Sequence, residues 1–165
     1  MALLVETGSG SPTAESYASV SDADTYHAAR GNAAWAALSS DSKEVNLRKA
    51  TEHLEQMYLG MWKGDKNLST QALSWPRSNV YVDDYLIANN ALPAQLVKAT
   101  CELALKASTG PLIVDEGAQV KSKQVGPIAV TYADGARQQK RYAAVDATLR
   151  PLLSGGGAGI RLVRA

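Results

Sequence analysis

Six basic residues and two tyrosines lie close together in the C-terminal third of the chain. They are Lys121, Lys123, Arg137, Lys140, Arg141 and Arg150, with Tyr132 and Tyr142. Cations that neutralise phosphates and rings that stack on bases are the components of a groove for single-stranded DNA. A solvated basic face beside two core tyrosines would have the same composition. Lys121, Lys123, Lys140 and Arg141 are therefore candidate contacts to DNA or to a neighbouring subunit.

The residue types that most often carry catalysis are few and scattered. His27 and His53 fall in different expected helices without cysteine or paired-acid spacing, which predicts boundary or surface positions and no metal site. Cys101 lies in an apolar, helix-like run, as expected for a small buried side chain. It would act as a nucleophile only if the fold brought a base to it. The glycines of 155–159 lack the Lys-Ser/Thr of a phosphate loop. Since each of these candidates fails, we expect no catalytic residue, no cofactor and no enzyme.

The chain ends in a glycine run followed by an apolar and basic tip. Four of residues 155–159 are glycine, and Ile160, Arg161, Leu162, Val163 and Arg164 follow. Glycine loses more backbone freedom on ordering than other residues, so this segment is a poor end to a self-contained core. Its apolar residues could add a strand to the sheet edge of a partner. The segment is either a docking tail or a frayed terminus.

Composition indicates one domain with a real core and an uneven charge distribution. The 165 residues are 45% hydrophobic and include no phenylalanine, which favours closely packed, alanine-rich helices. Residues 1–120 carry nine Lys/Arg against fourteen Asp/Glu, whereas residues 121–165 carry eight against two. Such a basic arm suits phosphates or an acidic protein surface. Glu6 in the apolar start argues against a signal peptide, and no apolar run is long enough to predict a membrane span.

Periodicity and capping signals predict five helical segments. They cover residues near 22–30, a short turn in 32–38, and then 41–59, 93–107 and 142–153. Ser21 and Asp41 are the expected starts of the first and third, and Pro151 should shorten or bend the last. Residues 119–125 and 128–132 alternate on either side of Gly126-Pro127, which predicts a β-hairpin.

These elements predict a mainly α fold: a small helical bundle with an inserted β-hairpin and extended N- and C-terminal arms. Residues 1–19, rich in Gly, Ser and Thr, are expected to form a flexible arm. Residues 20–153 form the helical domain, with the hairpin near 119–132, and residues 154–165 form the Gly-rich docking tail. The aromatic-rich segment 61–92 is expected to be an ordered loop.

The central motifs, in their order and spacing, resemble the head-tail connector (adaptor) proteins of tailed bacteriophages. The similarity covers most of residues 17–165. It is carried by segment 47–58, Trp62-Lys63-Gly64, the sequence QALSWPR at 71–77, Leu92-Pro93, ATCELA at 99–104, VGPI at 125–128, LRPL at 149–152 and Arg164-Ala165. Proteins of this kind are also labelled DnaT-like single-stranded DNA-binding proteins, a name that rests on weaker similarity.

The resemblance implies a structural virion protein at the head-tail junction, present in the host cytoplasm during assembly. Such an adaptor forms a ring of twelve copies beneath the portal protein and continues the channel for double-stranded DNA. Its other partners are neighbouring adaptor subunits and a tail-side stopper, tail terminator or tail tube protein. Ile160, Arg161, Leu162, Val163 and Arg164 would dock on the portal, and Trp62, Trp75, Pro76 and Arg77 would form a rigid structural turn. The alternative is a nonspecific, DnaT-like single-stranded DNA-binding protein.

Overall fold

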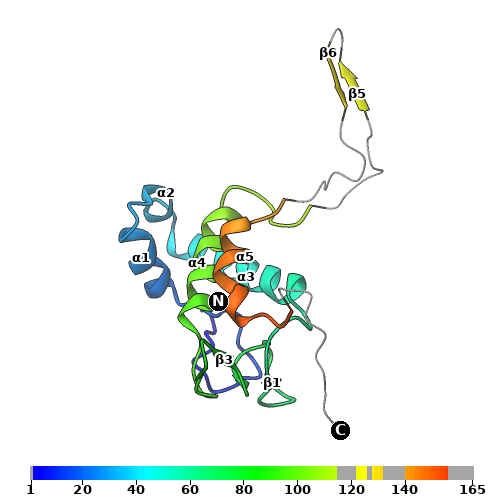
Figure 1. Ribbon diagram of the computed structural model, residues 1–165. Helices are drawn as coiled ribbons and strands as arrows, with labels where there is room; N and C mark the ends of the chain where they lie inside the picture. Colours follow the sequence, from blue (N-terminus) through cyan, green and yellow to red (C-terminus); the bar gives the residue numbers. More distant parts are fainter. Residues whose placement is uncertain (1, 115–121, 126–127, 132–139, 156–165) are drawn as a thin grey trace.

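The computed structural model describes residues 2–114, 122–125, 128–131 and 140–155, with only the backbone given for the strands between 122 and 131 (Figure 1). The helices are α1 (Val20–Ala28), α2 (Ala33–Ala36), α3 (Ser40–Met57), α4 (Ala94–Ala107) and α5 (Ala143–Leu149), followed by the 3-10 helix η1 (Arg150–Leu152). The predicted mainly helical fold is confirmed. Among the described residues, no helix is both long and apolar enough to cross a bilayer.

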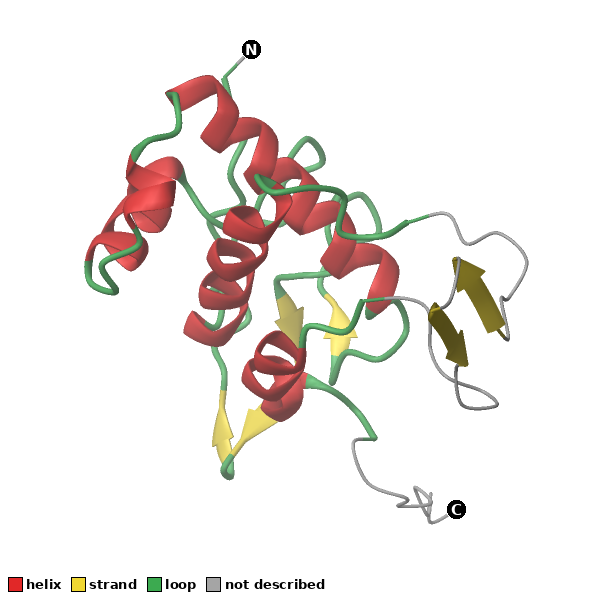
Figure 2. Ribbon diagram, turned by 90° about the horizontal axis from the view of Figure 1, so that it is seen from above, coloured by secondary structure: helices red, strands yellow, loops and turns green. Residues whose placement is uncertain are grey.

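Helix α4 is central, because it contacts α1, α3 and α5. Leu47 and Leu54 of α3, Leu96 and Leu103 of α4, and Leu149 of α5 are all fully buried in one core. Alanines on the same helices, including Ala50, Ala99 and Ala104, are also buried and let the helix backbones approach closely. Figure 2 shows the core from above, with helices around it and short strand pairs at its edge.

The helix starts differ slightly from the expected ones, because serines outside the helices cap them. Ser19 caps α1 in a reciprocal capping box: its hydroxyl accepts from the Asp22 N–H, and the Asp22 carboxylate accepts from the Ser19 N–H. Ser39 caps α3 by accepting from the Ser42 N–H at 3.2 Å. Both helices therefore begin before the predicted starts. At the other end of the domain, Pro151 lies in η1, where the regular helix α5 has already ended.

Residues 2–19 form an ordered part of the domain instead of the expected flexible arm. Tyr17 and Ala18 are buried, and Val5 pairs with Ser16 in an isolated bridge. The side chain of Glu6 is only 2% exposed, and its carboxylate accepts hydrogen bonds from backbone N–H groups of residues 7, 8, 10 and 11. The Gly-Ser composition predicts a mobile segment, but the segment is ordered because its backbone N–H groups donate to the buried Glu6 carboxylate.

Within the described residues, the short strands form three separate antiparallel pairs. In the aromatic-rich segment, β1 (Asp65–Lys66) pairs with β2 (Arg77–Ser78), and β3 (Tyr81–Val82) pairs with β4 (Tyr85–Leu86). These two pairs were not predicted, although the segment is ordered as expected. The third pair, β5 (Ser122–Val125) with β6 (Ile128–Thr131), confirms the predicted hairpin.

Candidate functional site

The Trp-Pro-Arg motif lies in the core. Trp62 and Trp75 are buried with ring centroids 6.0 Å apart in an edge-to-face arrangement, and a cis peptide bond joins Trp75 to Pro76. Arg77 donates to the carbonyls of Lys63 at 2.7 Å, Gly64 at 2.6 Å and Ser74 at 3.2 Å. Its guanidinium is therefore directed at the protein's own backbone, and the motif acts here as a structural clamp.

A buried polar network joins the N-terminal segment to the same motif. The hydroxyl of Tyr17 donates to Glu55 and accepts from the Trp75 N–H at 3.2 Å. Glu55 also accepts from the backbone and hydroxyl of Ser74, at 3.0 and 2.7 Å. Burial, and then the Glu55 carboxylate, raise the pKa of Tyr17 well above its ordinary value. Tyr17 thus stays a neutral donor, and the network holds three segments together.

The segment that contains the β5–β6 hairpin leaves and re-enters the helical domain at one place. Tyr142, on the returning side, donates from its hydroxyl to the carbonyl of Leu112, on the departing side, at 3.3 Å. Its ring meets that of His53 edge to face at 5.4 Å, and the Lys106 amino group lies 5.9 Å from its centroid. The two ends of this insert are therefore held together on the domain surface.

Two of the predicted contact residues, Lys140 and Arg141, adjoin this place and are exposed. Arg141 forms an ion pair with Asp146 at 2.6 Å, and Tyr58 donates to the same carboxylate. Burial alone would raise the pKa of Asp146, but the hydrogen bonds from Tyr58 and Arg141 bring it below its ordinary value. Arg141 is therefore already engaged within the chain.

Of the two remaining predicted contacts, Lys123 alone is among the described residues. Lys123 lies in β5, opposite Val130 of β6. Lys121 lies outside the described residues, as do Ile160, Arg161, Leu162, Val163 and Arg164. The predicted portal-docking tip and most of the predicted DNA contacts thus stay predictions.

Several other cations are also engaged. Lys43 pairs with Asp24 at 2.8 Å, Arg48 with Glu15 at 2.9 Å, and the Arg30 guanidinium stacks 3.5 Å from the Tyr26 centroid. Besides Arg30 and Arg141, the exposed cations of the described residues are Lys49, Lys66, Lys98, Lys140 and Arg150, in separate elements and loops.

Both histidines are buried, which corrects the expected boundary or surface positions. His27 uses both ring nitrogens, one with the Cys101 carbonyl at 3.0 Å and the other with Asn32 at 2.9 Å. His53 is 7% exposed, and its Nδ1 is buried without a hydrogen-bond partner. Burial raises the pKa of the Cys101 thiol to about 12, so that it carries a proton at neutral pH. In the part of the chain that is described, no cluster of three or more potential ligand residues could hold a metal.

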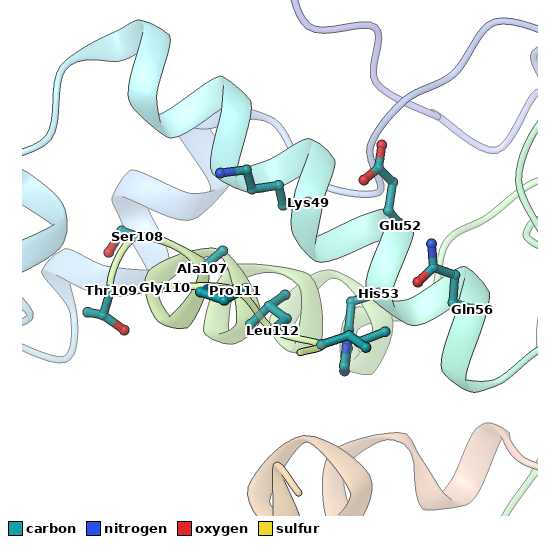
Figure 3. A pocket seen from close by; sticks show the side chains of 11 residues that line it. Lys49, Glu52, His53, Gln56, Ala107, Ser108, Thr109, Gly110, Pro111 and Leu112 are labelled. Carbon is teal, nitrogen blue, oxygen red and sulfur yellow. The ribbon is translucent and has the colours of Figure 1, made fainter. Parts of the chain in front are cut away.

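His53 is one of the residues that line a groove that the sequence did not reveal. Lys49, Glu52, His53 and Gln56 of α3 form one wall, and residues 107–113 after α4 form the other, around a volume of about 570 Å³ (Figure 3). We call it the His53 groove. The i, i+3, i+4, i+7 spacing along α3 could have indicated this wall, but nothing in the sequence showed which segment faces it.

A second feature missed from the sequence is the β3–β4 hairpin, here called the prong. It displays Tyr81 and Tyr85, of which 54% and 80% are exposed, and Leu86 beside them. Asp83 and Asp84 form its tip with φ of 51° and 66°. Two consecutive left-handed residues between paired strands are typical of a type I′ turn.

Comparison with known proteins gives a family match over the whole chain. Residues 1–165 match the family described as "Putative DnaT-like ssDNA binding protein". No curated protein and no solved structure is significantly similar to the chain.

Proposed function

We propose that this chain, which belongs to the family described as "Putative DnaT-like ssDNA binding protein", joins proteins to one another as a head-tail connector of a tailed bacteriophage. The observation that carries the proposal is the character of the described surface. Large apolar side chains such as Tyr85 and Leu59 are 80% and 75% exposed, whereas Arg77 and Arg141 are engaged within the chain. Exposed apolar groups favour protein contact over phosphate contact.

In this role the protein forms a ring under the portal and docks a stopper, tail terminator or tail tube protein on its other side. Twelve copies of 17.5 kDa give a ring of about 210 kDa around the DNA channel. The tip 160–164 docks on the portal through its apolar residues and two arginines. Because a ring repeats each contact, a weak individual contact is sufficient.

The test is to mix the protein with purified portal and to image the complexes. We expect an added ring on one end of the portal. Deleting residues 156–165 should abolish the ring without changing the thermal unfolding of the domain, and the Ile160→Asp/Leu162→Asp variant should reproduce most of the loss. Ser154→Ala is the control, at the exposed residue where the tail begins and outside its apolar tip. Full rings from the truncated protein would remove the docking role of the tail.

Binding of single-stranded DNA is the second candidate, and the description of the family favours it. The excess of basic residues in 121–165 is compatible with it. Titration of a labelled oligonucleotide should then give binding that weakens steeply with salt. If four phosphates are neutralised, the slope of log K against log salt is about −3.

The decisive variant replaces Lys121, Lys123, Lys140 and Arg141 by alanine. Its matched control replaces four exposed cations outside residues 121–165, Arg30, Lys49, Lys66 and Lys98. DNA binding through the predicted contacts requires that the first variant loses affinity and the second retains it. Equal losses would indicate attraction by net charge alone, and no binding at low salt would remove this candidate.

A further inference from the structure

The backbone of the prong is held by hydrogen bonds, whereas its exposed side chains, Tyr81, Tyr85 and Leu86, do not belong to the core of the domain. Tyr81 pairs with Leu86 and Val82 with Tyr85, and the Ile87 N–H donates to the Val80 carbonyl at 2.9 Å. The amino group of Lys63 donates to the Tyr81 carbonyl at 3.2 Å. A hairpin held in this way loses little conformational entropy on binding, and tyrosine is among the residues that contribute most at protein interfaces.

The chemistry of the prong defines what can cover it. Tyr85 needs an apolar surface for its ring and a polar partner for its hydroxyl. Asp83 and Asp84 at the tip repel phosphates and favour a partner that carries lysine or arginine. A nucleic acid therefore does not fit, whereas a protein groove with a cationic rim does.

The His53 groove offers the complementary groups. Its lining includes the apolar side chains of Pro111, Leu112 and Ile113. Lys49 lies on the wall, and Lys106 adjoins it through the Tyr142 ring, which contacts both Lys106 and His53.

The prong and the groove lie at opposite ends of α4. The prong precedes the start of α4 at Ala94, and the groove is formed by the segment that follows its end at Ala107 (Figure 1). A helix of 14 residues is roughly 21 Å long. The two features of one chain therefore cannot meet each other, but those of two copies can.

We propose that the prong of one copy inserts into the His53 groove of a second copy. The Tyr85 ring packs against the apolar lining of the groove, and the Asp83 and Asp84 carboxylates face Lys49 and Lys106. Glu52, on the same wall as Lys49, repels these carboxylates, so the contact forms only if the attraction of the two lysines outweighs this repulsion. Such a head-to-tail contact leaves one prong and one groove free, so it repeats to give a ring or a chain.

Site-specific disulfide trapping tests the contact directly. Protein with Tyr85→Cys is mixed with protein with Gln56→Cys under mild oxidation, while the buried Cys101 is retained in both. We expect a mixed dimer to form at least tenfold faster than in a control that pairs Tyr85→Cys with Ala29→Cys, an exposed position just after α1. The variant with both cysteines in one chain should give a ladder of larger species. A mixed dimer no faster than the control overturns the proposal.

Charge exchange provides a second measurement, using sedimentation of the folded protein over a concentration series. Asp83→Asn/Asp84→Asn keeps residues that tolerate the left-handed turn and should weaken association about tenfold. Lys49→Glu/Lys106→Glu should do the same, and adding Asp84→Lys to it should restore association. If the triple variant associates no better than Lys49→Glu/Lys106→Glu, the proposed contact is wrong.

The proposal deepens the connector role but can fail separately from it. Trapped dimers from a protein that forms no ring on the portal would support the contact and remove the connector role. If the protein forms rings on the portal but its copies are not trapped through Tyr85, the connector role is supported and the proposed contact is wrong.

Discussion

Single side chains in this protein hold together polar backbone groups from neighbouring turns. Glu6 accepts from the backbone N–H groups of residues 7, 8, 10 and 11, and Arg77 donates to the carbonyls of residues 63, 64 and 74. An unsatisfied buried backbone group costs about as much as a lost hydrogen bond. One substitution at either position therefore disturbs several groups at once.

Gly8 is required for the loop that surrounds Glu6. It has a φ of +101°, and a Cβ atom there would lie 2.0 Å from the Asn90 carbonyl oxygen. Gly8→Ala should lower the free energy of unfolding by about 2 to 4 kcal/mol, measured by urea denaturation. Gly31 is the matched control, since it has a φ of +66° and no atom within 4 Å of a built Cβ. Gly31→Ala should cost only about 1 kcal/mol, from the left-handed backbone alone. If both variants lose the same free energy of unfolding, the close approach to Asn90 does not account for the effect at Gly8.

The two buried histidines should make the protein less stable in mild acid. Burial lowers the pKa of both His27 and His53 below the ordinary value of 6.5, although Asp146 partly opposes this at His53. As the pH falls below 6.5, the unfolded chain takes up protons that the folded chain does not, so the free energy of unfolding decreases. Asp24 and Asp146, whose pKa values are lowered, lose their contributions only at lower pH.

Urea denaturation from about pH 7.5 to about pH 5 measures this dependence. The His53→Gln variant should show a smaller decrease than the wild-type protein over that range, because one proton-binding difference is removed. Asn46→Gln is a control for a change of buried volume on the same helix. An unchanged slope in His53→Gln would contradict the assignment.

At the scale of elements, the long helices were predictable and the short strands were not. The apolar spacing of Leu47 and Leu54 recurs along the 18 residues of α3, so one face is evident from the sequence. The strands β1 to β4 have two residues each, too few to show any period. They pair because Arg77 and the buried tryptophans fix the segment 61–92, which is a tertiary effect.

Replacing Arg77 by lysine should loosen this segment. Lysine has no planar fork and would retain at most part of the contacts to three carbonyls, so Arg77→Lys should lower the free energy of unfolding by about 1 to 3 kcal/mol. The exposed Arg150→Lys serves as the control and should change it by less than about 0.5 kcal/mol. Chemical denaturation measures both, and a loss at position 150 equal to that at 77 would contradict the clamp.

At the scale of the whole molecule, composition predicted one helical domain but misjudged which parts belong to it. Residues 2–19 are part of the core through Tyr17, although their glycines and serines indicated an arm. The candidate site was harder to predict, because the His53 groove combines α3 with a segment more than 50 residues away in the sequence. The exposed Tyr85 and the buried, unpartnered His53 become evident only once burial is known.

The insert should be dispensable for folding. Leu112 and Tyr142 already meet through a hydrogen bond, and Val145 and Leu149 of the following helix are buried in the core. Replacing residues 115–139 by a short Gly-Ser linker should therefore leave the helical content and melting temperature nearly unchanged. Circular dichroism measures both. As a control, the same linker replacing residues 83–84 within the prong should preserve the fold but remove the trapped dimer. Unfolding of the first variant would show that the insert belongs to the core.

The burial of every tryptophan in the chain also has an optical consequence. Trp35, Trp62 and Trp75 are all shielded from water, and two of them lie 6.0 Å apart. Indole emission shifts to longer wavelength on contact with water, so the intrinsic fluorescence of this protein reports the loss of its core. Contacts at the exposed tyrosines of the prong should leave that emission in place. Intrinsic tryptophan fluorescence therefore distinguishes unfolding of this protein from its association, and no added label is needed.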